Sequence, residues 1–197
     1  MVKVAIVDYK MGNIRSVYNA VKYVGVKPVV VSSPSKLKAE KIIIPGVGAF
    51  GDGVKNFKPF FPKIKEAVSS KVQVLGICLG MQMFFEMSEE SPRARGLPLI
   101  PGKIVKIRTP LKIPQIGWNL LKVTKSGCPL FNGVKKGYVY FDHSYHASPK
   151  EKVIAATTDY GATVTAAVWK GNLFGTQFHP EKSGEVGLKM LRNFLEA

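Results

Sequence analysis

The sequence predicts an α/β fold: a mostly parallel central sheet with helices on both faces, plus an added antiparallel β region. In the first half, short runs of branched apolar residues without polar alternation, such as residues 29–31 and 42–44, are separated by segments of helical periodicity. Strands of this kind are typical of a parallel sheet that is buried on both faces. Residues 102–125 and 138–177 are rich in β-branched and aromatic residues with turn signals between them, which favours antiparallel strands.

Strands and helices are expected to alternate along the first half. Apolar runs predict strands over residues 2–7, 29–31, 42–44 and 72–77. Helical spacing predicts helices over residues 13–24, 35–41, 57–70 and 79–87. Gly25 is expected to end the first of these helices, and Pro59 and Pro62 to restrict the third to its later part.

A hairpin and a closing helix are the clearest elements of the second half. Residues 162–169 and 173–177 flank the turn sequence Lys170-Gly171-Asn172, which predicts two antiparallel strands. Residues 184–197 carry apolar side chains at helical spacing and predict a helix. Because no internal repeat, low-complexity tract or linker interrupts the sequence, we expect one domain over residues 1–197.

The composition is that of a globular protein. Of the 197 residues, 46% are hydrophobic and 21% are charged, which excludes a disordered or fibrous chain. Two cysteines in a chain of this length do not predict a disulfide framework. The first residues resemble a buried strand rather than a signal peptide, and no run of about 18 apolar residues occurs. We therefore expect a cytoplasmic protein with no membrane association.

The chain is strongly basic, with 29 Lys and Arg against 13 Asp and Glu and a formal net charge of +16. Three explanations are open: a solvated basic surface, nucleic-acid binding, or attraction to an acidic protein partner. The lysines are scattered from Lys3 to Lys189, without zinc-finger spacing or an RNA-recognition aromatic motif. This scatter favours a solvated surface over nucleic-acid binding.

Residues 76–80 (Gly-Ile-Cys-Leu-Gly) match the pattern of a nucleophile elbow. They lie between a predicted strand and a predicted helix, which is the context that the motif requires. The two glycines permit neighbouring segments to approach closely where the strand turns into the helix. Cys78 is expected at the helix N-terminus, where the dipole favours the thiolate, with the N–H of Leu79 directed at a substrate oxygen. The alternative is a buried structural cysteine.

A thiolate that cleaves an amide needs a proton donor for the leaving amine. His179 stands directly after the predicted hairpin, in Gln177-Phe178-His179-Pro180-Glu181. The carboxylate of Glu181 is suited to hold one ring nitrogen of His179 and to direct the other toward sulfur. The alternative is an exposed loop histidine with a glutamate nearby by chance.

Acyl transfer also needs hydrogen-bond donors for the oxyanion. Residues 45–48 (Pro-Gly-Val-Gly) follow a predicted strand, at the edge where carboxyl ends of parallel strands meet and where Cys78 is expected. A simple turn or a phosphate-binding loop is the alternative, although the lysine–serine pair of a phosphate loop is missing. Cys128 has no elbow and is expected to be inert. No zinc-ligand spacing occurs, so we expect neither a metal nor a cofactor.

The elbow together with Phe178-His179-Pro180-Glu181 resembles the class I, or triad, glutamine amidotransferases. The likeness extends over essentially the whole chain and is strongest to one branch, the glutaminase subunits of imidazole glycerol phosphate synthase in histidine biosynthesis. Other segments similar to that branch are Asp8-Tyr9, Met11-Gly12-Asn13, Phe50-Gly51, Pro114, Gly117-Trp118-Asn119, His143-Ser144-Tyr145 and Lys182-Ser183. Val47 stands where other amidotransferases usually carry a second glycine, which favours this branch.

The resemblance implies an enzyme whose triad of Cys78, His179 and Glu181 hydrolyses glutamine through a glutamyl thioester. It implies no cofactor. The residues that it implies for the oxyanion site and for holding glutamine are Gly46, Val47, Gly48, Leu79, Gln82, His143, Ser144 and Tyr145.

The resemblance also implies a partner, because ammonia must pass directly to an acceptor and this chain has no second domain to hold one. In the family the acceptor is a (βα)8-barrel cyclase, which forms a heterodimer with the glutaminase. The residues implied to face the cyclase are Asn13, Trp118, Tyr140 and Lys182. An acidic cyclase surface would then account for the charge of +16, and no nucleic-acid partner is expected.

Two other functions stay open at this point: the glutaminase subunit of a different synthase, and a non-catalytic basic binding module that keeps the fold. The sequence departs from the family pattern at Lys10, where glycine is frequent, and at Gln115-Ile116, where His-Met is more usual. Asp142 and His146 are unusual neighbours of the His-Ser-Tyr segment. None of these departures falls on a triad residue.

Overall fold

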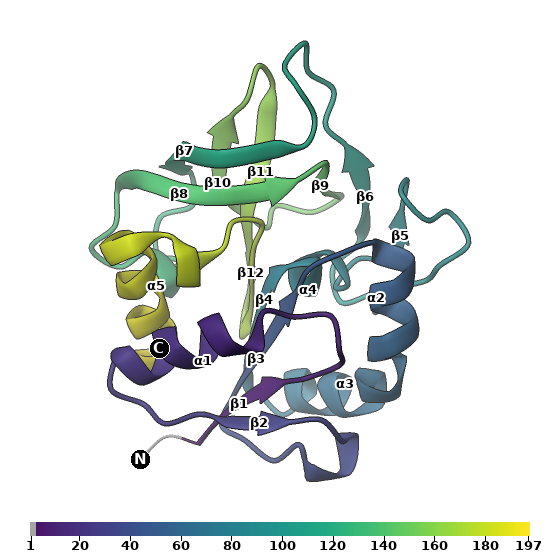
Figure 1. Cartoon of the computed structure of the whole chain (residues 1–197), viewed down its shortest axis with the longest axis vertical. Helices are drawn as coiled ribbons and strands as arrows, with labels where there is room; N and C mark the ends of the chain where they lie inside the picture. The colour runs from purple at the N-terminus through teal and green to yellow at the C-terminus, as the bar shows by residue number, and fades with distance from the viewer. Residues whose placement is uncertain (1–2) are drawn as a thin grey trace.

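A mixed sheet of nine strands runs through the computed structural model, which describes residues 3–197 (Figure 1). Its strands are β1 (Val4–Val7), β2 (Val29–Val31), β3 (Lys41–Gly46), β4 (Gln73–Cys78), β7 (Gln115–Val123), β8 (Lys136–His143), β10 (Ile154–Asp159), β11 (Thr163–Lys170) and β12 (Leu173–Thr176). Their order across the sheet is β2-β1-β3-β4-β12-β11-β10-β7-β8. The pairs from β2 to β12 are parallel, and the pairs from β12 to β8 are antiparallel. The predicted antiparallel region therefore continues the parallel sheet.

The remaining elements are helices, short 3₁₀ turns and a small second sheet. The α-helices are α1 (Ile14–Tyr23), α2 (Phe50–Phe57), α3 (Phe61–Ser69), α4 (Leu79–Gln82) and α5 (Gly184–Glu196). The 3₁₀ turns cover Pro34–Lys36, Lys58–Phe60, Pro129–Phe131 and Pro180–Lys182. The second sheet has the order β5-β6-β9 and consists of β5 (Met87–Ser88), β6 (Gly102–Lys106) and β9 (Tyr145–Pro149).

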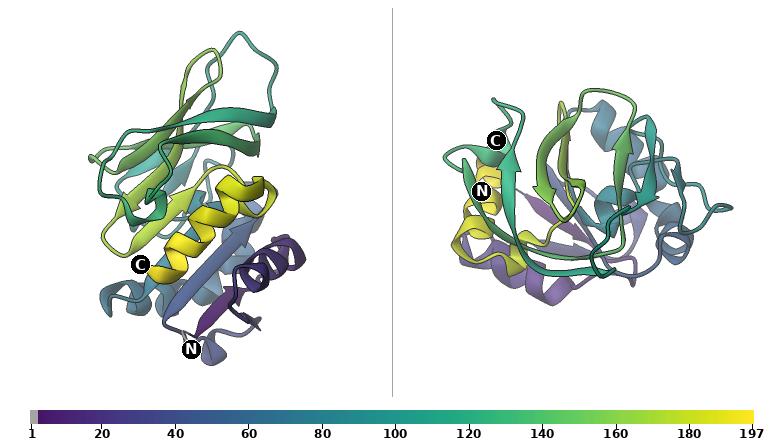
Figure 2. Two further views of the ribbon diagram at one scale, coloured as in Figure 1. Left: turned by 90° about the vertical axis from the view of Figure 1, so that its left-hand side faces the viewer. Right: turned by 90° about the horizontal axis from the view of Figure 1, so that it is seen from above.

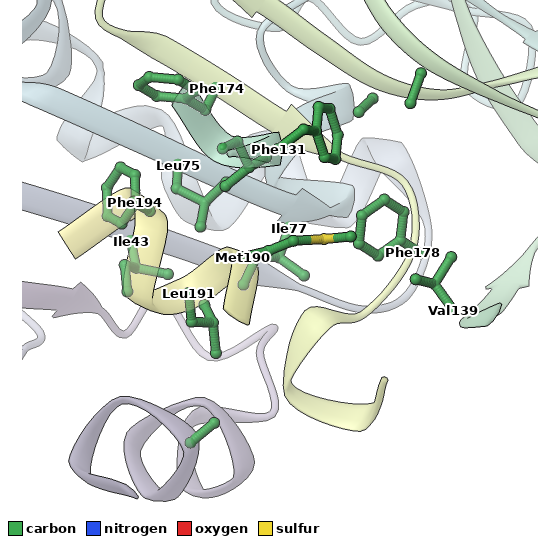
Figure 3. Close-up of a cluster of buried hydrophobic side chains, with 14 of the residues drawn as sticks. Ile43, Leu75, Ile77, Phe131, Val139, Phe174, Phe178, Met190, Leu191 and Phe194 are labelled. Atoms are coloured by element: carbon green, nitrogen blue, oxygen red, sulfur yellow. The ribbon is translucent and has the colours of Figure 1, made fainter. Parts of the chain in front are cut away.

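The parallel strands are buried on both faces, as predicted, because successive side chains of a strand point to opposite sides. On one face, Ile43 and Leu75 pack with Leu191 and Phe194 of α5, and α1 covers the same face (Figure 3). On the other face, Ile42 packs in a cluster with residues of α2, α3 and α4. Figures 1 and 2 show α1 and α5 on one side of these strands, with α2 and α3 on the other.

Two helices predicted in the first half were too long, and one helix was not predicted. The helix over 35–41 is only the 3₁₀ turn Pro34–Lys36, and Lys41 already pairs with β1 and β4 as the start of β3. The helix over 57–70 is restricted to its later part, as predicted: it begins at Phe61, after a 3₁₀ turn that contains Pro59. The helix over 79–87 ends at Gln82. The helix α2 was not predicted, because its two glycines lower helix propensity. Val2, at the start of the strand predicted over 2–7, lies outside the described residues.

The hairpin and the closing helix were predicted correctly. β11 and β12 pair antiparallel around the turn at residues 171–172, and α5 begins at Gly184. Within residues 3–197, no helix combines the length and apolar character needed to span a bilayer.

Phe194 tests the packing of α5 on the sheet. Its side chain is fully buried and meets the ring of Phe174 edge-on, with ring centroids 5.8 Å apart. We expect Phe194→Ala to lower the free energy of unfolding by about 3–5 kcal/mol, because it removes a large buried ring and leaves a cavity. Urea denaturation measures this loss. Phe61→Ala, at a partly exposed ring of α3, should cost clearly less, and equal losses would contradict the assignment.

Candidate active site

Cys78 lies at the bend between the last residue of β4 and the first turn of α4. Its φ of 54° and ψ of −112° place a non-glycine residue in a strained backbone region. The bend needs Gly80, because a Cβ there would collide with the carbonyl oxygen of Ile44 on the adjacent β3. The predicted elbow is therefore present, and it holds Cys78, a residue that is 6% exposed, at the N-terminus of a short helix.

His179 and Glu181 form a buried pair behind this cysteine. The Nδ1 atom of His179 lies 2.8 Å from Oε1 of Glu181, and the two side chains are 3% and 1% exposed. Burial by itself would lower the pKa of His179, but the sulfur of Cys78 and the carboxylate of Glu181 outweigh it and raise this pKa to about 10. The imidazole is thus charged at neutral pH, with its Nδ1–H donating to Glu181. The fold brings the three predicted triad residues together from β4 and from the turn after β12.

A pocket of about 150 Å³ opens beside the sulfur. The residues that line it are Val47, Gly48, Cys78, Leu79, Gln82, Glu90, Asp142, His143, Ser144 and Tyr145. All the residues predicted to hold glutamine or its oxyanion are in this set except Gly46. Gly46 is the last residue of β3 and is packed against Tyr9, where a Cβ would collide with the phenol oxygen.

Part of the pocket wall is fixed by hydrogen bonds to one carbonyl group. The carbonyl oxygen of Tyr145 lies 2.8 Å from Nδ1 of His143 and accepts from Nε2 of Gln82 at 3.1 Å. Burial lowers the pKa of His143 to about 4, so its ring is neutral and Nδ1 carries the proton that Tyr145 accepts. The side chain of His143 therefore holds the turn between β8 and β9, while Ser144 lines the pocket.

Glu90 is a pocket residue that the sequence motifs did not identify. Its Oε2 accepts from the N–H of Phe50 at 2.7 Å, at the first turn of α2. This bond fixes a carboxylate in the wall of the pocket. The only advance signal was its place in an acidic run, Glu89-Glu90, of an otherwise basic chain.

In the loop after β3, the N–H group of the central residue, Val47, is hydrogen-bonded within the protein. The N–H of Val47 donates to the carbonyl oxygen of Met11 at 2.6 Å, so it is directed away from the pocket. Gly48 has a φ of +103°, a conformation that favours glycine. Leu79 begins α4, and the first N–H groups of a helix have no partner within the helix.

Three of the residues predicted to face a partner form a cluster next to His179. The ring of Trp118 on β7 lies 6.2 Å from that of Tyr140 on β8, and Nζ of Lys182 lies 5.3 Å from the Tyr140 ring centroid. The carbonyl oxygen of Tyr140 accepts from the N–H of His179 at 2.9 Å. Asn13 instead caps α1, with its side chain accepting from the N–H of Ser16.

Two further groups complete the description of the site. Gln177 donates from Nε2 to the sulfur of Cys78 at 3.5 Å, and no motif predicted this contact. Burial raises the pKa of Cys128 to about 11, which is consistent with an inert thiol. Among the described residues, no three His, Cys, Asp or Glu side chains converge as a set of metal ligands.

A strand–elbow–helix cysteine with a buried histidine–glutamate pair defines a class of enzyme, and comparison with known proteins agrees. The family profile described as "Glutamine amidotransferase class-I" matches residues 5–197, so the chain belongs to the class I glutamine amidotransferases. The structure labelled "Structure of PurLQS from Thermotoga maritima" shares the fold, with a TM-score of 0.83 and 24% identity, over 100% of this chain and 99% of that chain.

Within this class, the chain belongs with the imidazole glycerol phosphate synthase subunits HisH. The HisH of Methanocaldococcus jannaschii is 45% identical over 194 residues, which is 98% of this chain and 98% of that protein. The HisH of Bacillus mycoides is 47% identical over 196 residues, which is 97% of this chain and 93% of that protein.

The charge on His179 can be tested by a substitution of Glu181, which pairs with it. Glu181→Gln keeps the shape of the side chain and removes its negative charge. We expect the pKa of His179 to fall from about 10 by about one unit or more. The carboxylate of Glu181 then no longer counteracts burial, which lowers this pKa. Titration of the imidazole by NMR measures the change. Glu185→Gln, at an exposed position in the first turn of α5, should leave the pKa of His179 unchanged; a similar fall in both variants would contradict the pairing.

Proposed function

We propose that this chain is the glutaminase subunit of an imidazole glycerol phosphate synthase in histidine biosynthesis. The observation that carries the proposal is the elbow thiol of Cys78 beside the buried, charged pair of His179 and Glu181. The identity of 43–47% to HisH subunits over nearly their whole length supports the assignment to this synthase.

The geometry supports a two-step hydrolysis. The thiolate of Cys78 attacks the side-chain carbonyl carbon of glutamine, and the oxyanion forms near the N–H of Leu79. The C–N bond then breaks, the leaving nitrogen takes a proton from His179, and ammonia departs. A water molecule that gives a proton back to His179 cleaves the thioester, which releases glutamate and regenerates the thiolate. Glu181 keeps the imidazole oriented and stabilises its charge throughout.

The pocket offers groups for both ends of glutamine. The carboxylate of Glu90 suits the α-ammonium group, because it supplies a negative charge that is already fixed by the N–H of Phe50. Gln82 and the turn of His143, Ser144 and Tyr145 supply further polar groups to the wall of the pocket. These roles extend the set that the family resemblance implies by one residue, Glu90.

The bond from Val47 to Met11 supports a gated enzyme. An oxyanion site needs preorganised donors aimed at the developing charge, and the N–H of Val47 is bound elsewhere. We propose that partner binding turns this loop so that the N–H of Val47 points toward the pocket. The isolated chain is then a poor glutaminase, because Leu79 supplies the oxyanion donor by itself.

An exposed apolar strip supports a protein partner next to the active site. It consists of Ile116, Trp118 and Leu120, alternate residues of β7 that are 61%, 53% and 36% exposed, and Tyr138, which lies opposite Leu120 on β8 and is 61% exposed. Contiguous exposed apolar surface is typical of an interaction site. We propose that the (βα)8-barrel cyclase covers this strip and that Tyr140, Lys182 and Asn13 lie near its border.

The first test is glutamine hydrolysis with and without the cyclase and its ligand. We expect slow hydrolysis by the isolated chain and strong stimulation in the complex, because the oxyanion loop is set by the partner. Cys78→Ala should abolish glutamate release, since no other side chain of the pocket can form the thioester. Cys128→Ala is the matched control and should retain activity, because Cys128 lies outside the pocket.

Several outcomes would contradict the proposal. Full activity of the isolated chain would contradict control of the oxyanion loop by a partner. An active Cys78→Ala variant would exclude Cys78 as the nucleophile. Glu90→Gln should raise the KM for glutamine; an unchanged KM would remove its substrate-holding role. Stimulation by a synthase other than the cyclase would reassign the partner.

The second test asks whether the cyclase binds to the apolar strip. We expect Trp118→Ala to weaken cyclase binding at least about tenfold, because central aromatic anchors carry much of the energy of an interface. Isothermal titration calorimetry measures the affinity. Tyr23→Ala, at a 72% exposed ring on α1 outside the strip, should bind as the wild type does.

The same titration at rising salt tests the origin of the net charge of +16. If an acidic cyclase surface attracts this chain, the affinity falls as salt screens the charges. Affinity that stays constant with salt would leave the basic surface without this explanation.

A further inference from the structure

Gln177 is a fully buried side chain that connects the nucleophile to the substrate pocket. It follows β12 directly, two residues before His179, and its backbone N–H donates to the carbonyl oxygen of Ala166 at 2.8 Å. Its Nε2 donates to the sulfur of Cys78 at 3.5 Å, and its Oε1 accepts from Nε2 of Gln82 at 3.1 Å. One amide group thus contacts both the attacking atom and a residue of the pocket wall.

The neighbours of Gln177 determine which way its amide points. Gln82 must present its NH₂ group to the carbonyl oxygen of Tyr145, because a carbonyl accepts and cannot donate. The same NH₂ group faces Gln177, so Gln177 must offer its oxygen to Gln82. Its own NH₂ group is then directed at the sulfur of Cys78, which is the arrangement that favours a negative sulfur.

The hydrogen bond from Gln177 to Cys78 differs from the usual hydrogen bonds of buried side-chain amides. Most buried side-chain amides bond to backbone groups or water, as Asn193 does with the carbonyl oxygens of Leu130 and Asn132. Within residues 3–197, the side chain of Gln177 instead bonds to Cys78 and Gln82. A hydrogen bond to a charged group stabilises it more than one to a neutral group, and burial strengthens this difference.

We propose that Gln177 is a positioning residue for the nucleophile: its NH₂ group holds and stabilises the thiolate of Cys78, while its oxygen orients Gln82 toward the substrate. This inference rests on the proposed function and deepens it, because it adds to the triad a neutral donor that contacts the sulfur in addition to the charged imidazole. The chain Tyr145–Gln82–Gln177–Cys78 then sets the direction of attack relative to the pocket wall.

The experiment is the pH dependence of Cys78 alkylation by iodoacetamide, measured on the full chain by peptide mass spectrometry. We expect Gln177→Met and Gln177→Glu to move the half-maximal pH upward by at least about one unit, because each replaces the donor that stabilises the negative sulfur. Gln177→Glu keeps the shape of the side chain, so it remains informative if the methionine variant does not fold.

Two controls make the result specific. Gln115→Met removes another fully buried amide, one that donates to neither Cys78 nor Gln82, and its alkylation curve should follow that of the wild type. Cys128 is an internal reference thiol in every sample, because it is 3% exposed and its labelling should not change while the fold is intact.

The proposal is overturned if the Cys78 curves of both Gln177 variants superimpose on the wild-type curve. It is also overturned if Cys128 labelling rises in parallel, because the variants then loosen the whole fold. Alkylation requires neither glutamine turnover nor a partner. A failure of the hydrolysis experiment would therefore contradict the proposed function but would not test the role of Gln177. A failure of the alkylation experiment would contradict the role of Gln177 but would not test the proposed function.

Discussion

The site depends on the backbone bend at Cys78, where β4 turns into α4 with a positive φ. A non-glycine residue keeps such a conformation only when its surroundings enforce it. Here β3 and β12 enclose β4 on its two edges, and Gly80 lets α4 lie directly against β3. The bend places the sulfur in the lining of the pocket and at a helix N-terminus. The same packing that stabilises the fold therefore creates the reactive geometry.

The residues that could be predicted from the sequence are those whose chemistry is local. The glycines around Cys78 and the spacing of His179 and Glu181 are short-range signals, because each element needs only its own turn to form. Glu90 was not predicted, because tertiary packing brings it to the site from a segment without a motif. Gln177 stands beside the His179 motif, but its contact with Cys78 was not predicted because tertiary packing creates it. The helix α2 was missed for a related reason: its Gly53, which disfavours a helix, is needed where Leu79 packs against it.

The active site and the proposed partner surface share one structural wall. Tyr140 is bonded through its carbonyl oxygen to the N–H of His179, while its ring contacts Trp118 on the exposed strip. Val47 also lines the pocket, and its N–H is held by Met11. The pocket beside Cys78 thus joins His179, the proposed proton donor, which is already hydrogen-bonded to Tyr140, and a loop in which the N–H of Val47 is bound to Met11. Such an arrangement separates the part of the site that is already assembled from the loop that, in our proposal, a partner completes.

The position of β12 has a consequence for the newly made chain. This strand lies between β4 and β11, so residues 173–176 fill a gap in the middle of the sheet rather than extend its edge. His179 and Glu181 reach the cysteine only after that gap is filled. During synthesis on the ribosome, Cys78 therefore emerges about a hundred residues before His179 and Glu181, the groups that we propose activate it. The thiol of the nascent chain therefore stays unactivated until β12, the last strand, is inserted. The reactivity of Cys78 then indicates that the sheet has formed completely.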